Sequence, residues 1–290
     1  MKSLLPTLII FLLAVMSCSQ NTKKSQKENN AIYLNSANRM LVIGHRGEPD
    51  IAPENTMSSN KLAWKMGADM VECDVWLTAD NKIVVIHDEN TQRVSGEYME
   101  IEKSTADSLQ KLDVGKVKNP EYVKEKIPLL SELINAIPKG KKLVIEIKSE
   151  DQIVPYLSRE IDSLKADSLV EFISFHLNAI KAIKKSLPHI PSYLLIDSLS
   201  QQQVFALVDS AKINGLDGVD VHHGIVNKAF MDKATQEDFP VITWTVDSLT
   251  EAERLRKLGV AAITTNRAGF MLKNLYGITP AESVPEGALK

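Results

Sequence analysis

Short runs rich in β-branched and other apolar residues recur along the chain from residue 40 onward, separated by amphipathic segments. Nine of these runs have the length and composition of strands. They are Leu41–His45, Met70–Trp76, Ile83–His87, Leu143–Ile147, Phe172–Phe175, Tyr193–Ile196, Gly218–Val221, Val241–Val246 and Ala261–Thr264. Between them, the apolar residues of 153–164 recur at helical spacing, and a capping box of Ser248 and Glu251 predicts a helix that ends at Gly259. Alternating strands and helices indicate a parallel sheet covered by helices.

The pattern predicts an α/β fold, a (β/α)8 TIM barrel, although nine runs exceed the eight strands of such a barrel by one. The second and third runs are separated only by residues 77–82, whereas a parallel connection needs about a dozen residues or more. We therefore expect these two runs to form a β-hairpin extension after the second barrel strand. With Asp80 and Asn81 as the two turn residues, the register places Asp74 opposite His87.

The chain after residue 40 contains no internal linker or low-complexity stretch, which predicts one barrel domain over residues 40–279 and a short C-terminal tail over 280–290. Residues 91–128 do not fit a barrel helix. Their glycine, proline and charge content predicts a small insertion on the active face of the barrel.

The N-terminus has the pattern of an export signal. Residues 1–17 combine a basic start with an apolar run that is too short for a membrane helix, which needs about 18 or more apolar residues. The string Val-Met-Ser-Cys at residues 15–18 resembles the lipobox of bacterial lipoproteins, in which the cysteine carries the lipid. An ordinary secretory signal with an incidental cysteine is the alternative, but residues 19–30 have no apolar side chain, as suits a tether. We expect a signal peptide, a lipidated Cys18 and a disordered tether over 18–39.

These expectations place the protein outside the cytoplasm, lipid-anchored in a bacterial cell envelope, facing the periplasm or in the outer membrane. The lipid is the only membrane contact that the sequence predicts. The net charge of −3 lacks the Lys/Arg surplus with which proteins bind nucleic acid, and no required protein partner is evident. The two cysteines, Cys18 and Cys73, exclude a disulfide framework.

Three carboxylates lie toward the carboxyl ends of predicted strands. Glu72 and Asp74 are two residues apart and so point to the same face of their strand, and Glu146 has a similar position on a later strand. Barrel active sites form at the carboxyl ends of strands, so the three are expected to meet. Buried together they would repel one another, and a metal ion removes the conflict. Ligands that are all oxygen favour one hard divalent cation, Ca²⁺ or Mg²⁺.

Two histidines and two cations accompany these carboxylates. His45 and His87 also end predicted strands and can transfer protons near neutral pH, whereas Arg46 and Lys148 supply positive charge for a phosphate. Each residue has an ordinary alternative: an exposed strand edge, a surface ion pair or a hydrogen-bonded polar group. These alternatives do not explain well why such residues stand at the carboxyl ends of several strands in the same orientation.

The sequence resembles the glycerophosphodiester phosphodiesterase family from Met40 to about Leu275. The matching motifs are Gly44-His45-Arg46-Gly47, Ala52-Pro53-Glu54-Asn55-Thr56, Gly67-Ala68-Asp69, Glu72-Cys73-Asp74-Val75, Thr78-Ala79-Asp80-Asn81, His87-Asp88, Ile127-Pro128-Leu129-Leu130, Glu146-Ile147-Lys148, Ser174-Phe175, Trp244-Thr245-Val246 and Ile263-Thr264-Thr265-Asn266. The resemblance implies a barrel enzyme that requires a divalent cation and cleaves glycerophosphodiesters to sn-glycerol 3-phosphate and an alcohol.

The resemblance also implies roles by position. The implied metal ligands are Glu72, Asp74 and Glu146, the acid and base are His45 and His87, and the phosphate ligands are Arg46 and Lys148. Asn55 matches an asparagine that the family keeps beside the metal, although it also fits as the cap of the first helix. Trp244 matches an aromatic wall against the glycerol, although it equally fits as a core residue.

The chain departs from the family pattern at two places. Glu48 and Asp50 stand where small residues are more usual and would add acidic charge near the mouth, and Ala268 stands where a proline is frequent. Two other functions stay open: the same barrel acting on another phosphodiester, such as a lysophospholipid or a glycerol-phosphate polymer, or a non-catalytic surface binding lipoprotein. The intact set of histidines and carboxylates argues against the binding protein.

Overall fold

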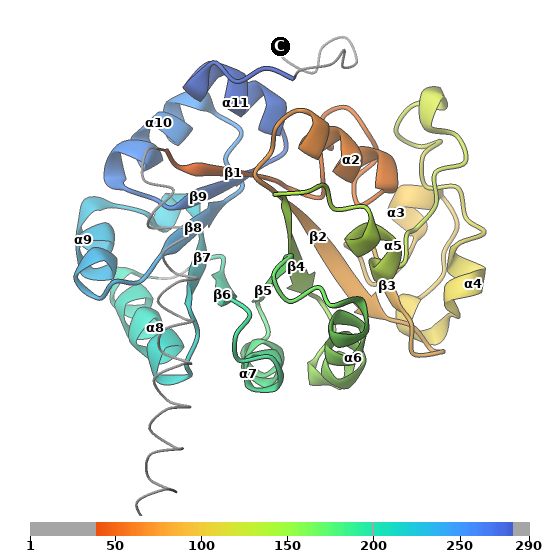
Figure 1. Cartoon of the computed structure of the whole chain (residues 1–290), viewed down its shortest axis with the longest axis horizontal. Coiled ribbons are helices and arrows are strands. Elements are labelled where there is room, and N and C mark those ends of the chain that lie inside the picture. The colour runs from red at the N-terminus through yellow and green to blue at the C-terminus, as the bar shows by residue number, and fades with distance from the viewer. Residues whose placement is uncertain (1–38, 199, 281–290) are drawn as a thin grey trace, which may run out of the picture.

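The computed structural model describes residues 39–198 and 200–280 and shows a ring of strands surrounded by helices (Figure 1). Eight parallel strands close into a barrel because β1 pairs with both β2 and β9, and β3 adds to β2 as an antiparallel strand. The expected (β/α)8 barrel with a hairpin extension is therefore confirmed. The expected signal peptide, Cys18, the tether up to residue 38 and residues 281–290 lie outside the described residues.

All nine expected runs form strands, with ends that differ from the expectation by no more than two residues. The strands are β1 (Leu41–Gly44), β2 (Met70–Leu77), β3 (Ile83–Val85), β4 (Lys142–Ile147), β5 (Val170–Ser174), β6 (Ser192–Ile196), β7 (Gly218–His222), β8 (Val241–Trp244) and β9 (Ala262–Thr265). The α-helices are α2 (Met57–Lys65), α3 (Gln92–Ser95), α4 (Ala106–Leu109), α5 (Leu130–Asn135), α6 (Val154–Leu164), α7 (Leu177–Ser186), α8 (Gln201–Ile213), α9 (Lys228–Gln236), α10 (Leu249–Leu258) and α11 (Ala268–Tyr276). The 3₁₀ helices are η1 (Ile101–Lys103), η2 (Pro120–Tyr122), η3 (Asp151–Ile153) and η4 (His223–Ile225). Among the described residues, no helix is both long enough and apolar enough to cross a membrane.

The hydrophobic core has two main parts because side chains alternate across each strand. One cluster fills the barrel and consists of Leu41, Ile43, Met70, Val144, Ile173, Tyr193, Leu195, Ile242 and Ala262. The residues between them in the sequence, such as Val42 and Val71, point outward and pack against the helices in a larger cluster. This alternation also determines which polar side chains enter the barrel at its carboxyl end.

The register of the β2–β3 hairpin differs by one residue from our expectation. The backbone N–H of Ile86, and not that of His87, donates to the carbonyl of Asp74. The connecting loop comprises residues 79–81, which is one residue longer than a two-residue turn. Asn81 adopts a left-handed conformation with φ of 60°, which is typical of the last position in a three-residue hairpin loop.

The two helices expected from sequence signals are present, and one detail is wrong. The apolar spacing over 153–164 corresponds to α6, and α10 ends at Gly259, whose φ is 84°. The expected capping box is not formed, because Ser248 makes no side-chain hydrogen bond to the first turn of α10. The Glu251 carboxylate instead binds Nδ1 of His223 at 2.8 Å and the guanidinium of Arg254 at 2.6 Å.

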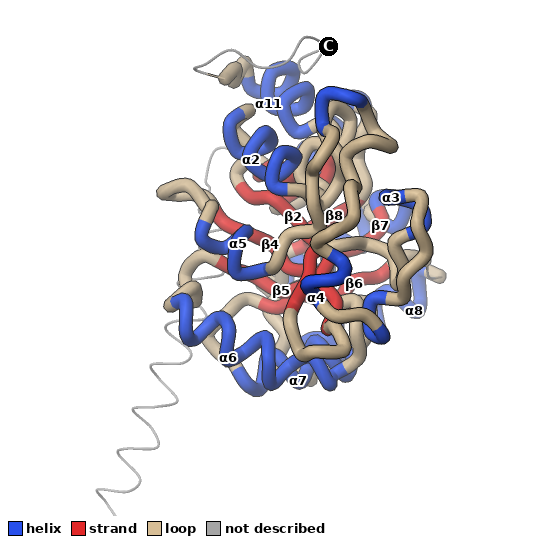
Figure 2. The backbone as a smooth tube through the Cα atoms, turned by 90° about the vertical axis from the view of Figure 1, so that its right-hand side faces the viewer, coloured by secondary structure: helices blue, strands red, loops and turns tan. Residues whose placement is uncertain are grey.

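The segment between β3 and α5 lies on one side of the barrel, at the right of Figure 1, and faces the viewer in Figure 2. It contains α3, α4, η1 and η2, which pack around a separate small apolar cluster that includes Ile101, Leu109 and Ile127. We refer to residues 91–128 as the insertion. Tyr122 of the insertion packs against a cluster formed by α2 and the loop before it.

A buried ion pair at the amino end of the barrel allows a test of what stabilises the fold. Nζ of Lys184, in α7, lies 2.6 Å from Oδ2 of Asp217, and both residues are buried. The variant Lys184→Met leaves this carboxylate buried without its cation, so we expect it to lower the free energy of unfolding by about 3–5 kcal/mol in urea titrations. Lys185→Met, at the exposed neighbouring position, is the control and should change it by less than about 0.5 kcal/mol. Equal effects of the two variants would contradict the prediction.

Candidate active site

The inward face of the barrel changes from apolar to charged residues toward the carboxyl ends of the strands. On β2 the inward series is Met70, Glu72 and Asp74, and on β4 it is Val144 and Glu146. Strand pairing places Asp74 beside Glu146. The structure therefore brings together the three carboxylates whose convergence the sequence predicts.

Glu72, Asp74 and Glu146, which we call the acidic cluster, each offer a carboxylate oxygen, and these oxygens lie within 4.8 Å of one another. Burial and the charges of Asp74 and Glu146 raise the pKa of Glu72 well above its usual value, and burial raises the pKa of Glu146 to about 7. Two buried oxygens, Oε1 of Glu72 and Oδ1 of Asp74, have no hydrogen-bond donor in the described structure. An arrangement of oxygen ligands that lack donors fits a hard divalent cation.

Arg46 and Lys148 lie directly against the acidic cluster. Nε of Arg46 is 3.4 Å from Oδ2 of Asp74, and Nζ of Lys148 is 2.8 Å from Oε1 of Glu146 and 3.5 Å from Oδ1 of Asp74. Burial alone would raise the pKa of Asp74, but these two cations outweigh it and hold that pKa below its usual value. Positive charge is thus available at the position where a phosphate would approach the cluster.

The loop after β1 folds back on itself so that its backbone contacts the acidic cluster. Arg46 has a left-handed φ of 55°, and its backbone N–H donates to Oε2 of Glu72 at 2.9 Å. Gly47 follows with φ of 96°, and a Cβ there would lie 2.3 Å from the hydroxyl oxygen of Ser59. Only glycine fits this position, and left-handed conformations of residues such as Arg46 are concentrated at functional sites.

Asn55 lies beside the acidic cluster and does not cap the first helix. Its side-chain amide donates to Oδ2 of Asp74 at 2.8 Å, and its own φ is 58°. The N-cap of α2 is the next residue, Thr56, whose hydroxyl accepts from the backbone N–H of Ser59. Of the two alternatives that the sequence left open, the structure therefore favours a position next to the carboxylates.

His45 is the first of three side chains that are joined by hydrogen bonds. Its Nδ1 lies 2.8 Å from Oδ1 of Asn266, and the amide nitrogen of Asn266 donates to Oδ2 of Asp247 at 2.7 Å. Because Asp247 fixes the orientation of that amide, the Asn266 oxygen faces the ring, and Nδ1 of His45 must carry the hydrogen. Burial and the charge of Arg46 lower the pKa of His45 and favour a neutral ring with Nε2 available as a proton acceptor.

His87 has a charged partner instead of an amide. Its Nδ1 lies 2.7 Å from Oδ1 of Asp88. The other oxygen of Asp88, Oδ2, accepts a hydrogen bond from Nε of Arg93 at 2.6 Å. Arg93 also donates to both oxygens of Glu54, and Glu54 accepts from Arg46 at 3.0 Å. Although burial opposes it, the hydrogen bond from Arg93 lowers the pKa of Asp88 to about 2. These five residues form a continuous chain of ion pairs, the rim network, from the acidic cluster to His87.

The sequence did not indicate several of these partners. Glu54, Asp88 and Asn266 belong to the motifs of the family, but nothing in their spacing assigned them a contact. Arg93 lies in the insertion, where no periodic pattern predicted which side chains return to the barrel. Only the three-dimensional arrangement reveals that these residues orient the two histidines.

Trp244 is half-buried at the carboxyl end of β8 and packs against the apolar cluster inside the barrel. Its ring makes edge contacts with Phe175 at 5.5 Å and with His222 at 5.7 Å between centroids. The residue therefore extends the interior core upward to the rim. His176 and His223 also lie at the rim, where they pair with Glu150 and Glu251 as ordinary polar residues do.

Glu48 does not add acidic charge to the mouth of the barrel. It is buried beside the start of α11, where the backbone N–H groups of Ala268 and Gly269 offset part of the rise in its pKa that burial causes. A proline at position 268 would lack one of these N–H groups, so the two departures from the family pattern, Glu48 and Ala268, lie next to each other in the fold. Asp50 pairs with Arg267 at 2.8 Å.

The buried Glu48 predicts a specific pH dependence of stability. Burial raises its pKa from 4.5 to about 8, so its contribution to stability is complete below about pH 4.5 and is lost as the pH rises through 8. Glu48→Gln should therefore gain stability relative to wild type between pH 5 and 8, by at most about 1.4 kcal/mol per pH unit, in urea titrations. A Glu48→Gln difference that is the same at both pH values would contradict the assignment.

Comparison with known proteins supports the chemistry that this geometry indicates. Residues 45–270 match the model of the glycerophosphoryl diester phosphodiesterase family. A glycerophosphodiester phosphodiesterase of Caldanaerobacter subterraneus subsp. tengcongensis is 31% identical over 236 residues, which cover 79% of this chain and 94% of the relative. Fold and sequence together define a phosphodiesterase built on a (β/α)8 barrel. The chain belongs to the glycerophosphoryl diester phosphodiesterase family.

Two solved structures are similar over nearly their whole length. A phosphodiesterase of Oleispira antarctica, in complex with the product sn-glycerol-3-phosphate, has a TM-score of 0.77 and 25% identity, covering 82% of this chain and 97% of its own. A glycerophosphodiester phosphodiesterase of Parabacteroides distasonis has a TM-score of 0.69 and 26% identity, covering 82% of this chain and 98% of its own. Both agree with the barrel architecture described above.

Proposed function

We propose that the protein hydrolyses glycerophosphodiesters to sn-glycerol 3-phosphate and an alcohol, with one divalent cation, Ca²⁺ or Mg²⁺, held by the acidic cluster. The observation that carries the proposal is the convergence of three buried carboxylates, two cationic side chains and two histidines at the carboxyl end of one barrel. The names of the relatives support the same class of substrate.

The cation would withdraw charge from the phosphoryl oxygens. Arg46 and Lys148 lie beside the cluster and orient the phosphate through charge-assisted hydrogen bonds. Asn55 keeps the Asp74 carboxylate in place through its amide. Trp244, with Phe175 at its edge, provides an aromatic wall at the rim against which the carbon atoms of the glycerol can pack.

The two histidines have different partners, which assigns them different roles. His45 holds a proton on Nδ1 toward Asn266, so Nε2 is the atom that accepts a proton from the attacking nucleophile. His87 donates Nδ1–H to the Asp88 carboxylate, a charged partner where His45 has a neutral amide. We therefore assign His45 as the general base and His87 as the general acid that protonates the leaving oxygen.

The direct test is release of sn-glycerol 3-phosphate from glycerophosphocholine and glycerophosphoethanolamine by the full chain with Ca²⁺, with Mg²⁺ or with a chelator. We expect product only when metal is present. His45→Ala and His87→Ala should each lower kcat by about 100-fold or more, because each removes a proton transfer. His189→Ala, on an exposed histidine paired with Asp167 at the opposite end of the barrel, is the control and should keep full activity.

Product release that persists in the chelator would refute the metal requirement, and near wild-type turnover by either histidine variant would refute the acid–base assignment. Absence of product with any metal would leave the barrel as a phosphodiesterase for another diester. Metal binding by the wild type, compared with Glu146→Gln, would then show whether the acidic cluster works as a metal site.

We also propose that Cys18 anchors the protein to a membrane of the cell envelope through a lipid, with residues 1–17 removed. The lipobox-like string at residues 15–18 and the polar segment after it support this proposal. Bacteria that express the full chain with labelled palmitate should incorporate label into the wild-type protein, and Cys18→Ser should abolish it. Cys73→Ser is the matched control, because that thiol is buried in the barrel wall. Label that persists in Cys18→Ser would place the lipid elsewhere.

A further inference from the structure

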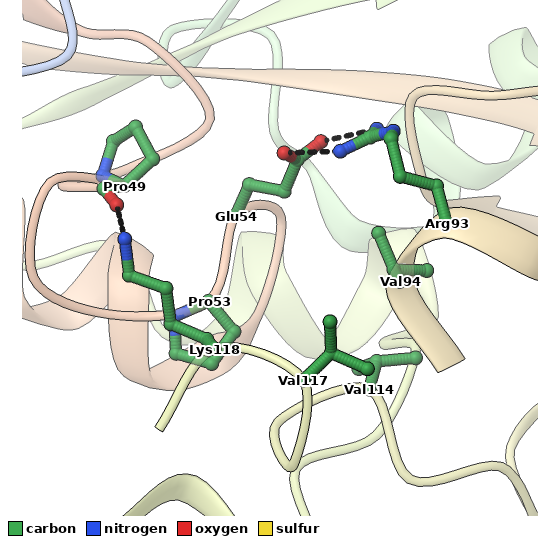
Figure 3. Close-up of a pocket in the computed structure, with 8 residues that line it drawn as sticks. All are labelled: Pro49, Pro53, Glu54, Arg93, Val94, Val114, Val117 and Lys118. Carbon is green, nitrogen blue, oxygen red and sulfur yellow. Dashed lines mark hydrogen bonds and ion pairs between the residues drawn. The ribbon is translucent and has the colours of Figure 1, made fainter. Parts of the chain in front are cut away.

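A cavity of about 230 Å³ lies beside the candidate active site, between the loop after β1 and the insertion (Figure 3). Its walls are Pro49, Pro53, Glu54, Arg93, Val94, Val114, Val117 and Lys118. In Figure 3 the three valines lie together on one side, and the two prolines with Lys118 lie on the other. The proposed hydrolysis by itself assigns no role to this space.

The charged groups of the cavity are already paired within the protein. Glu54 is bound by Arg93 at 2.7 and 2.8 Å and by Arg46 at 3.0 Å. Arg93 is also bound to Asp88, and Nζ of Lys118 donates to the carbonyl of Pro49 at 2.5 Å. A charged ligand group would have to displace one of these partners, so the cavity favours an uncharged occupant.

The remaining walls are apolar and partly open to water. Val94, Val114 and Val117 face the two prolines, and Val117 is 57% exposed. Covering such surface with an aliphatic group is favourable, because apolar area is removed from water on both sides of the contact. The cavity therefore has the shape and chemistry of a site for a short alkyl chain.

The cavity adjoins the proposed catalytic residues. Glu54, which lines it, binds Arg46, and Arg46 contacts the acidic cluster. A smaller space of about 10 Å³ shares Glu54, Val94 and Val114 with the cavity and is also lined by Asn55 and His87. The cavity lies next to β1 and the insertion, whereas the aromatic wall comes from β5 and β8. Two substituents on one phosphate can thus extend toward two different surfaces.

We propose that this cavity binds an uncharged aliphatic group carried by the substrate phosphate, so that the enzyme prefers diesters with an alkyl or acyl chain over those with a small charged head group. The proposal rests on the proposed function, because it requires the phosphate to lie at the acidic cluster. It names the substrate class that the sequence could not distinguish.

Monoalkyl phosphates provide a test that does not depend on turnover. Titration calorimetry of ethyl, butyl and hexyl phosphate with the full chain, in Ca²⁺ and separately in Mg²⁺, should show Kd falling about twofold to fourfold for each added methylene. A Kd that does not change with chain length, or no binding of hexyl phosphate up to millimolar concentration, would overturn the proposal.

Two matched variants test whether the alkyl chain of the ligand binds in this cavity. Val117→Asp puts a charge into the cavity and should abolish the dependence of Kd on chain length. Val123→Asp makes the same change at another exposed valine of the insertion, which does not line the cavity, and should keep the dependence. A dependence that survives Val117→Asp would show that the chain binds elsewhere and would overturn the proposal.

These experiments distinguish a failure of the cavity proposal from a failure of the proposed hydrolysis. Hydrolysis of glycerophosphocholine without any chain-length dependence would support the function and refute the cavity as an alkyl site. Chain-length-dependent binding that Val117→Asp removes, together with no hydrolysis of any glycerophosphodiester, would support the cavity and refute the proposed reaction.

Discussion

The mutual repulsion of three buried carboxylates is the constraint on which the candidate site depends. Glu72, Asp74 and Glu146 sit within the barrel mouth, where water cannot screen their charges, and their close approach costs free energy unless positive charge compensates it. Arg46 and Lys148 supply part of that charge. The left-handed backbone of Arg46 serves the same purpose, because it directs an N–H group at Glu72. Local strain in the loop after β1 is thus offset by the stabilisation of the cluster.

The alternation of side chains along strands explains why so much could be predicted from the sequence. Once Ile43, Met70 and Val144 are assigned to the barrel interior, His45, Glu72 and Glu146 must follow on the same face two residues later. The convergence of the acidic cluster follows from this rule, whereas the fold class and the strand positions follow from apolar runs that alternate with amphipathic segments. The rule fails where the chain leaves the strands. The hairpin register changed with one extra loop residue, and nothing periodic revealed that Arg93 returns to the rim.

Glu48 illustrates the other limit of sequence reasoning. Its position two residues after Arg46 suggested an acidic group at the mouth, but its side chain is buried beside the backbone N–H groups at the start of α11. That helix begins at Ala268, two residues after Asn266, which orients His45. Two apparently unrelated departures from the family pattern therefore meet near one turn, next to the asparagine whose oxygen faces Nδ1 of the proposed base. Contacts between a loop and a helix that is distant in the sequence cannot be predicted from local sequence patterns.

The rim network connects this arrangement to the insertion. Arg93 comes from the insertion, yet its guanidinium is the common partner of Glu54 and Asp88, so it links Arg46 with the His87 ring. The same ion pairs satisfy the charges around the neighbouring cavity and leave its walls apolar. The orientation of the proposed acid and the polarity of the adjacent cavity therefore depend on the same side chains. A change in the insertion that displaced Arg93 would therefore alter both the hydrogen bonding around His87 and the polarity of the cavity.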